Sequence, residues 1–286
     1  MTELLKLDRV SRQLSGFALQ EISFGLEPGY IMGLIGPNGS GKTTTIKLIM
    51  NMFQRNSGSI WVNGLDNLQD EMNVKQCIGY VSDENIFAED WTADNVGKGF
   101  SIYFNTFDLS TYRSYLKRFE LPRRKKIKTF SRGMKTRLML AAALSRQTKL
   151  LVLDEPTSGL DPVVRTELLN ILQEYIADGA HSVLFSTHIT TDLEKVADYI
   201  TFICKGRQMF TQNKDELMEA YQIIRGAPED LDTVLRHSLI GLRENHMGFE
   251  ALAKIEALPA CLPAGLIRER PTLDDIVVYH TMGVAQ

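Results

Sequence analysis

Short apolar runs of strand length recur along most of the chain and are separated by helical patterns. Residues 19–26 alternate between apolar and polar positions, which is typical of a half-buried strand. Residues 30–35, 150–153 and 183–185 are nearly continuous apolar runs, as expected for strands that are covered on both faces. The alternation of such strands with helices predicts an α/β fold built on a parallel sheet.

Two helices are predicted in the second half of the chain. Apolar residues recur at helical spacing over residues 164–176, and Asp161 followed by Pro162 is a favourable N-cap and first turn for that helix. Thr191 and Glu194 have the spacing of a capping box, which predicts the start of a further helix. Each helix follows an apolar strand, as in an α/β domain.

The middle and the end of the chain differ in composition from the rest. Residues 84–130 are rich in aromatic residues and end in an amphipathic pattern, so we expect an inserted helical subdomain over about residues 84–145. Four of the nine prolines follow residue 213, and no phosphate-binding motif occurs there. We therefore expect one domain over residues 1–213 and a small C-terminal accessory region over residues 214–286.

Composition narrows the classes of protein that fit. The 32 basic and 35 acidic residues give a formal charge of −3, which argues against nucleic acid as the main partner. No stretch approaches the roughly 18 uninterrupted apolar residues of a transmembrane helix, and residues 1–8 lack the apolar core of a secretory signal. Cys77, Cys204 and Cys261 are far apart, so we expect ordinary reduced cysteines. The chain is expected to be a cytosolic protein.

A glycine-rich segment at residues 36–43 matches the phosphate-loop pattern G-x-x-x-x-G-K-[ST]. It follows the apolar run at residues 30–35 and precedes a helical pattern, which is the context that this loop requires. Backbone N–H groups of such a loop bind phosphates, Lys42 is expected to contact the β- and γ-phosphates, and the Thr43 hydroxyl is expected to ligate Mg²⁺. The residues predicted to bind nucleotide here are Gly36, Pro37, Asn38, Gly39, Ser40, Gly41, Lys42, Thr43 and Thr44.

An acidic pair follows the apolar run at residues 150–153. Asp154 stands where the strand ends, so we expect its carboxylate to approach the Mg²⁺ at the carboxyl edge of the sheet. The neighbouring Glu155 is expected to polarise the water that attacks the γ-phosphate. Together with the phosphate loop, this pair predicts an ATPase site.

Residues 130–134, Phe-Ser-Arg-Gly-Met, open an apolar helical pattern before Asp154. This segment resembles the signature motif of ABC ATPases, usually written L-S-G-G-Q, and retains its serine and second glycine as Ser131 and Gly133. The resemblance implies that Ser131, Arg132 and Gly133 close over the γ-phosphate that the opposite subunit holds. Arg132 departs from the motif, and we expect it to alter affinity without removing the site.

Further residues match the ABC pattern in the same order along the chain. Residues 158–161 resemble the D-loop, which implies that Asp161 passes between the two subunits, and His188 resembles the switch histidine that contacts the γ-phosphate. Asp83 stands where the family has the Q-loop glutamine, and a carboxylate there can accept a hydrogen bond from water or approach Mg²⁺ but cannot donate as an amide does. The resemblance implies Glu155, His188 and Asp83 as the catalytic residues.

The adenine contact departs most from the family. The resemblance places an aromatic residue near position 14, where this chain has Leu14, which offers apolar contact only. Phe17 is the aromatic residue that could replace it. Both residues are therefore expected at the adenine end of the nucleotide.

The resemblance spans residues 3–212 and implies a P-loop NTPase fold of the ABC ATPase type with an N-terminal β-subdomain. It implies ATP and Mg²⁺ as cofactors, and as partners a second copy or a paralogous ATPase subunit and a transmembrane permease subunit. The chain would then sit at the cytoplasmic face of the plasma membrane and contact the membrane only through that permease. Asp83 and the C-terminal region resemble bacterial drug and peptide exporters, including those of phenol-soluble modulins, which favours export. The alternative is a regulatory ABC-type ATPase without a role in transport.

Two features retain two interpretations each. Trp91, Tyr103, Phe104 and Phe107 are expected in the core of the helical subdomain or, as the family suggests, in a groove that receives a short helix of the membrane subunit. The basic residues 123–128 are expected to form a solvated loop, or to contact anionic lipid or an acidic segment of the partner.

Overall fold

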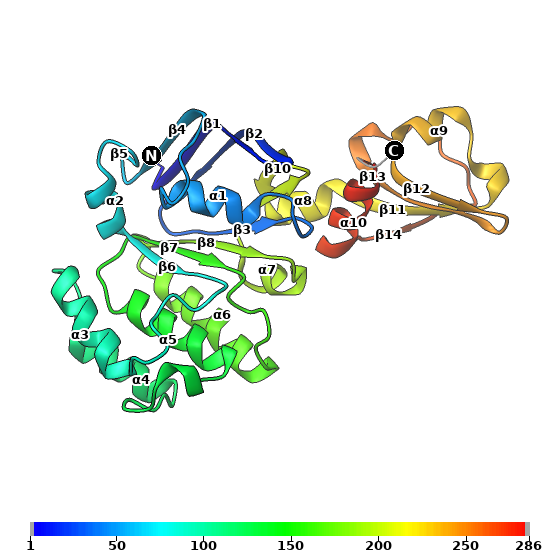
Figure 1. The fold of residues 1–286 in the computed structure, drawn as a ribbon. Coiled ribbons are helices and arrows are strands. Elements are labelled where there is room, and N and C mark those ends of the chain that lie inside the picture. The colour runs from blue at the N-terminus through cyan, green and yellow to red at the C-terminus, as the bar shows by residue number, and fades with distance from the viewer. Residues whose placement is uncertain (1–2, 284–286) are drawn as a thin grey trace.

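The computed structural model describes residues 3–283, which form two sheets and the helices around them (Figure 1). The strands are β1 (Leu5–Leu14), β2 (Phe17–Leu26), β3 (Ile31–Ile35), β4 (Ser57–Val62), β5 (Leu65–Asp66), β6 (Ile78–Val81), β7 (Leu150–Asp154), β8 (Ser182–Thr187), β9 (Tyr199–Cys204), β10 (Arg207–Asn213), β11 (Tyr221–Gly226), β12 (Leu239–Asn245), β13 (Gly248–Lys254) and β14 (Ile267–Glu269). The helices are α1 (Lys42–Ile49), α2 (Glu71–Cys77), α3 (Ala93–Tyr103), α4 (Leu109–Arg118), α5 (Arg132–Leu144), α6 (Pro162–Ile176), α7 (Thr190–Val196), α8 (Lys214–Ala220), α9 (Thr233–Ser238) and α10 (Leu273–Gly283). Within residues 3–283, no helix combines the length and the apolar character needed to cross a membrane.

The larger sheet has ten strands in the order β5-β4-β1-β2-β10-β9-β3-β8-β7-β6. Strands β9, β3, β8, β7 and β6 pair in parallel, whereas β5, β4, β1 and β2 pair antiparallel. The apolar runs predicted as strands are confirmed, since every residue of β3, β7 and β8 is buried. A parallel strand covered on both faces needs apolar side chains at successive positions, which explains these uninterrupted runs.

Alternate residues of β7 contribute to two separate cores. Leu151 and Leu153 belong to the core that contains residues of α5 and α6, whereas Leu150 and Val152 belong to the core that contains α1 and the antiparallel strands. Successive side chains of a strand point to opposite faces, so the parallel sheet lies between these two groups of elements. Figure 1 shows α3, α4, α5 and α6 together on one side of this sheet and α1 on the other.

Helix starts in the middle of the chain use side-chain caps. Thr92 and Asn95 form a capping box at the start of α3, and Asp108 accepts a hydrogen bond of 2.7 Å from the Ser110 N–H at the start of α4. The helix predicted over residues 164–176 is confirmed as α6, whose first backbone N–H groups donate to the side chain of its N-cap Asp161. These caps satisfy N–H groups that have no partner within the helix.

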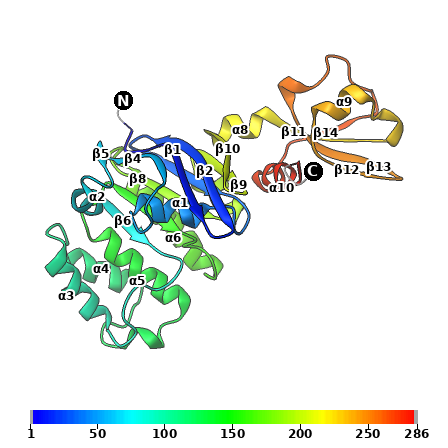
Figure 2. The same cartoon turned by 45° about the horizontal axis from the view of Figure 1, so that its top comes forward.

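The C-terminal region forms a second sheet rather than an irregular tail. After β10 ends, α8 leads to four strands in the order β12-β13-β11-β14, which stand apart from the larger sheet in Figure 2. Ile224, Leu235 and Phe249 are buried together between these strands and α9. The sequence predicted an accessory region here but not this fold.

Helix α10 attaches the second sheet to α7. The Leu273 N–H donates to Glu194 Oε1 at 2.8 Å, and the Thr190 hydroxyl donates to Asp274 Oδ1 at 3.4 Å. The capping box predicted from Thr191 and Glu194 is therefore wrong. Helix α7 begins at Thr190, so both residues lie inside it, and the Glu194 carboxylate caps the start of α10 instead.

Candidate nucleotide-binding and hydrolysis site

The phosphate loop joins β3 to α1 and packs closely against the end of β9. A Cβ atom at Gly36 would overlap the carbonyl oxygen of Ile203, so a larger residue does not fit there without a backbone shift. Gly39 and Gly41 have φ angles of 76° and 119°, which side-chain-bearing residues rarely adopt. Because Gly41 is the N-cap of α1, the unpaired N–H groups of that helix lie at the loop, where they favour an anion.

Lys42 is buried beneath the phosphate loop, with 6% of its side chain exposed. Its Nζ donates to the Gly36 carbonyl oxygen at 2.7 Å and lies 3.6 Å from Glu155 Oε1. Burial lowers the pKa of Lys42, and the carboxylates of Glu155 and Asp154 act in the opposite direction. An ammonium group in this place is suited to contact a phosphate.

Two hydroxyl groups hold the carboxylate of Asp154, the last residue of β7. Thr43 Oγ1 donates to Asp154 Oδ1 at 3.2 Å, and Ser186 Oγ donates to the same oxygen at 2.6 Å. Magnesium prefers oxygen ligands, so the Thr43 hydroxyl and the Asp154 carboxylate fit such an ion. Sequence analysis missed Ser186, whose signal was a polar residue directly after the apolar run at 183–185.

Glu155 is held in an uncommon backbone conformation. Its φ angle is 50°, and its N–H donates to the Ser186 carbonyl oxygen at 3.0 Å. A non-glycine residue at positive φ costs free energy, and such residues concentrate at functional sites. Glu155 Oε2 lies 2.7 Å from His188 Nδ1, and the Glu155 side chain is 13% exposed. A carboxylate held by an imidazole beside a phosphate site can orient a water molecule for attack.

One cavity of about 520 Å³ contains most of the predicted nucleotide residues. Phe17 lies against the phosphate loop there, and a Cβ at Gly41 would be 3.1 Å from Phe17 Cζ. Leu14 stands three residues earlier in the β1–β2 hairpin and is not part of the lining. Of the two residues predicted to contact adenine, Phe17 is therefore the better candidate. The described lining residues are Phe17, Asn38, Gly39, Ser40, Gly41, Lys42, Thr43, Thr44, Asp83, Glu155, Ser158 and His188.

The predicted signature residues and Asp161 of the D-loop lie outside this cavity, whereas Ser158 of the D-loop lines it. Ser131 is the N-cap of α5, and its Oγ accepts a hydrogen bond of 3.2 Å from the Met134 N–H. Gly133 lies in the first turn of α5, and Asp161 is the N-cap of α6. Arg132 forms an ion pair with Asp83. The cavity of one chain therefore contains the phosphate loop, Asp83, Glu155 and His188 but not the signature residues.

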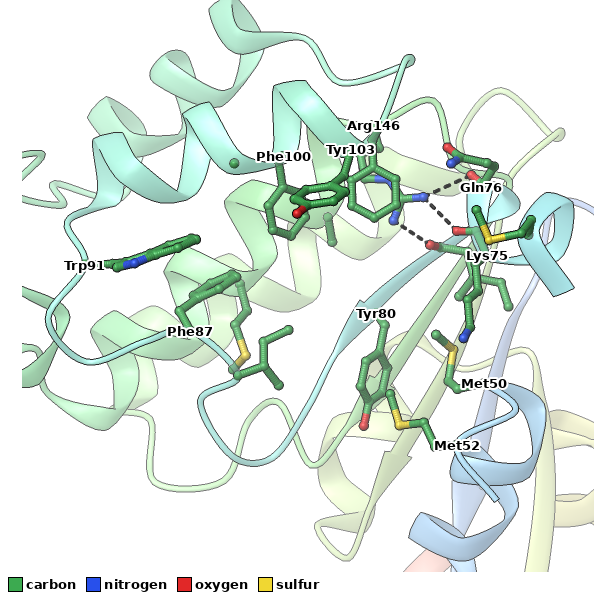
Figure 3. A pocket seen from close by; sticks show the side chains of 17 residues that line it. Met50, Met52, Lys75, Gln76, Tyr80, Phe87, Trp91, Phe100, Tyr103 and Arg146 are labelled. Atoms are coloured by element: carbon green, nitrogen blue, oxygen red, sulfur yellow. Dashed lines mark hydrogen bonds between the residues drawn. The ribbon is translucent and has the colours of Figure 1, made fainter. Parts of the chain in front are cut away.

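A second, apolar pocket of about 480 Å³ lies between the helical subdomain and the segment around α2. Figure 3 shows Trp91, Phe100 and Tyr103 on the side of α3, with Met50 and Met52 opposite them. Trp91 and Tyr103 are 44% and 78% exposed, so they are not core residues. We name this surface the apolar groove; it is lined by Met50, Met52, Met72, Lys75, Gln76, Ile78, Tyr80, Ile86, Phe87, Trp91, Gly99, Phe100, Tyr103, Phe104, Met139, Ala143 and Arg146.

Phe104 and Phe107, the other two residues with two interpretations, are partly buried. The guanidinium carbon of Arg146 lies 3.6 Å from the ring centroid of Phe104, a cation–π contact inside the groove. Phe107 packs against the rings of Phe100 and Tyr112. The core interpretation therefore fits Phe107, whereas the groove interpretation fits Trp91 and Tyr103.

The basic segment at residues 123–128 is exposed and partly neutralised. Arg123 pairs with Asp94 at 2.9 Å, and Lys126 and Lys128 both pair with Asp90, at 3.1 and 3.0 Å. Such exposed pairs contribute little to the stability of a fold. This geometry favours the solvated-loop interpretation of the segment.

Comparisons with known proteins agree with this geometry. Residues 19–158 match the family model described as "ABC transporter". The chain is 30% identical over 239 residues to the ABC transporter ATP-binding protein YtrB of Bacillus subtilis. This match covers 83% of this chain and 82% of that protein. It is 32% identical over 199 residues to the lantibiotic transport ATP-binding protein SrtF of Streptococcus pyogenes, covering 69% of this chain and 85% of that protein.

A solved structure, described as the ATP binding subunit of an ABC transporter, superimposes with a TM-score of 0.70. It is 27% identical, and the match covers 76% of this chain and 92% of the other. ABC ATP-binding subunits hydrolyse ATP to power transport and work with transmembrane subunits. This chain belongs to the ABC transporter family, as an ATP-binding subunit and an ATPase.

Proposed function

We propose that this chain pairs head-to-tail with a second copy or a paralogous ATPase subunit and hydrolyses ATP between them to drive a permease. The observation that carries the proposal is the grouping of Lys42, Glu155 and His188 around one cavity. The signature residues and Asp161 lie outside that cavity. A partner in the opposite orientation would bring its own signature residues to the phosphate, where a serine and N–H groups at a helix N-terminus favour an anion.

In this proposal six residues in or beside the cavity have definite parts in hydrolysis. Thr43 and Asp154 would hold Mg²⁺, which would supply positive charge to neutralise the phosphates. Lys42 gives up its contact with the Gly36 carbonyl to bind the β- and γ-phosphates. Glu155, oriented by His188, positions the attacking water, while Asp83 accepts a hydrogen bond from water or approaches the metal. Catalysis is then mostly positioning and electrostatic stabilisation.

Substituting Glu155 with glutamine tests this composite site. The Glu155→Gln variant keeps the size of the side chain but removes the carboxylate, so ATP and Mg²⁺ should bind and remain unhydrolysed. We expect phosphate release from the wild type, none from the variant, and an ATP-dependent dimer of the variant on gel filtration. A variant that stays monomeric with ATP, even with the membrane partner present, would exclude the head-to-tail site and favour the regulatory alternative.

The apolar groove is the proposed contact with the transmembrane permease. Exposed aromatic side chains in a concave apolar surface are efficient anchors for a helix of a partner. If the adjacent gene encodes a multi-spanning membrane protein, that protein is the partner to test. We expect Tyr103→Ala to weaken its co-purification, whereas Ile102→Ala should not, because Ile102 is 77% exposed but lies outside the groove lining. Equal loss with both variants would place the contact elsewhere.

Export of a peptide or drug-like substrate at the cytoplasmic face of the plasma membrane completes the proposal. Similarity to SrtF, whose name assigns it to lantibiotic transport, supports a peptide-like substrate. The complex reconstituted in inside-out vesicles should accumulate a labelled lantibiotic with ATP. Accumulation of neither this peptide nor a labelled hydrophobic drug, despite full ATP hydrolysis, would contradict this substrate class.

A further inference from the structure

Two of the residues that depart from the ABC motifs meet in the structure. Arg132 stands in the signature segment and Asp83 at the Q-loop position, 49 residues apart in sequence, yet Arg132 Nη2 pairs with Asp83 Oδ1. Asp83 also lines the nucleotide cavity of its own chain. Arg132 therefore reaches from the surface proposed to face the partner's nucleotide to a carboxylate beside its own nucleotide.

We infer that the Arg132–Asp83 pair is an exchange contact between the two ATP sites. The γ-phosphate held by the partner subunit draws Arg132 away from Asp83, and the Asp83 carboxylate is thereby released toward the nucleotide of its own chain. This inference rests on the head-to-tail pairing proposed above. In this exchange Arg132 contacts the γ-phosphate held by the partner subunit directly. Asp83 competes for Arg132 and so controls when that contact forms.

The charges at the start of α5 support this exchange. Arg132 and Lys135 both stand in the first four residues of the helix, where the dipole favours negative charge and cations are unfavourable. Each is offset by a carboxylate of the segment after β6, Asp83 for Arg132 and Glu89 for Lys135 at 3.4 Å. In the single chain, protein carboxylates thus pair with the two cations at the start of α5.

The strength of the pair suits an exchange rather than a permanent link. The side chains of Arg132 and Asp83 are 52% and 44% exposed, and pairs so exposed change an equilibrium by about fivefold at most. Arginine binds phosphate through two parallel hydrogen bonds, which a single carboxylate oxygen does not match. A phosphate can therefore displace Asp83, while the pair still raises the ATP concentration needed for dimer formation.

The position of Arg132 beside the D-loop connects the exchange to the subunit boundary. Arg132 Cδ would lie 3.4 Å from a Cβ at Gly159, within the segment between Glu155 and Asp161. If the Arg132 side chain moves toward the partner, it therefore moves along the D-loop, which is proposed to lie between the two subunits. The exchange is a positioning step that comes before hydrolysis, so it should act on dimer formation even where Glu155 is absent.

A double-mutant cycle in the Glu155→Gln background tests the inference. The readout is the ATP concentration for half-maximal dimer formation at saturating Mg²⁺, measured by sedimentation velocity. We expect Asp83→Asn, which frees Arg132, to lower this concentration about two- to fivefold. Arg132→Ala, which removes the phosphate contact, should raise it, and Asp83→Asn should give no improvement when Ala stands at 132.

A matched control uses the exposed pair of Arg123 and Asp94, which lies outside the nucleotide cavity. Arg123→Ala and Asp94→Asn should leave the ATP concentration unchanged. If Asp83→Asn and Arg132→Ala shift it in the same direction, or if the Asp83→Asn gain persists without Arg132, the exchange is refuted while the dimer stands. If the Glu155→Gln parent forms no ATP-dependent dimer, the proposed pairing itself fails and the exchange fails with it.

Discussion

Ser186 offers the sharpest test of how the fold prepares the proposed Mg²⁺ site. Its hydroxyl donates to Asp154 Oδ1 at 2.6 Å, and both side chains are at most 1% exposed. Ser186→Ala removes this bond and leaves Asp154 with its weaker contact to the Thr43 hydroxyl at 3.2 Å. A hydrogen bond to a charged group contributes about 1.5–3 kcal/mol, which agrees with the tenfold to hundredfold loss of metal affinity typical when a ligand loses its supporting partner.

The assay is ATP hydrolysis as a function of Mg²⁺ concentration. We expect the Ser186→Ala midpoint to rise about tenfold to hundredfold. Ser182→Ala is the matched control on the same strand, because the buried Ser182 hydroxyl donates to the neutral carbonyl of Glu27 at 2.9 Å, away from the cavity. It should cost about 0.5–1.5 kcal/mol of stability without moving the Mg²⁺ midpoint. An unmoved midpoint for Ser186→Ala, or equal shifts for both variants, would refute the reasoning.

Three further predictions follow from single side chains. Phe17→Ala should weaken ATP binding about fivefold to hundredfold while Leu14→Ala leaves it unchanged, as measured with a fluorescent nucleotide; equal losses would refute the choice of Phe17 for adenine. Gly36→Ala should abolish nucleotide binding because its Cβ would overlap the backbone of Ile203. Gly39→Ala, whose Cβ meets nothing within 4 Å but whose φ of 76° is unfavourable for alanine, should weaken binding less. Burial lowers the pKa of His280 below its usual 6.5, so the unfolded chain binds this proton more readily and stability falls as pH drops below about 6.5. Urea unfolding of His280→Phe should lack that part of the pH dependence, and identical pH profiles would contradict it.

Local backbone chemistry explains which parts of the site were predictable from sequence. The phosphate loop needs glycines at particular φ angles and a helix directly after it. These requirements fall on consecutive residues, so the sequence alone reveals the loop. Asp154 and Glu155 end a strand whose burial shows as an apolar run. Both positions follow from this one segment. In the structure Glu155 lines the cavity with Lys42, and Asp154 lies beside it in contact with Thr43.

Contacts between distant segments explain what the sequence did not reveal. The Glu194 carboxylate, expected to cap its own helix, caps α10 instead, 79 residues later. The resemblance placed the adenine contact near Leu14, but the β1–β2 hairpin brings Phe17 rather than Leu14 against the phosphate loop. The strands of the second sheet are only partly buried and lack the uninterrupted apolar runs of β3 and β7, so their pattern is too weak a signal to predict their pairing.

The Arg132–Asp83 pair shows why motif departures should be judged together. Considered singly, a charged residue in the signature and a carboxylate in place of an amide each suggest a weakened site. In the structure Arg132 and Asp83 are counterions, so the positive charge of Arg132 balances the negative charge of Asp83. Replacing only one of the two residues with a neutral one would leave the charge of the other unbalanced beside the proposed phosphate site. Together, the two residues add no net charge there. The two departures therefore constitute one feature of this ATPase, and its activity is expected to depend on their coupling rather than on either residue alone.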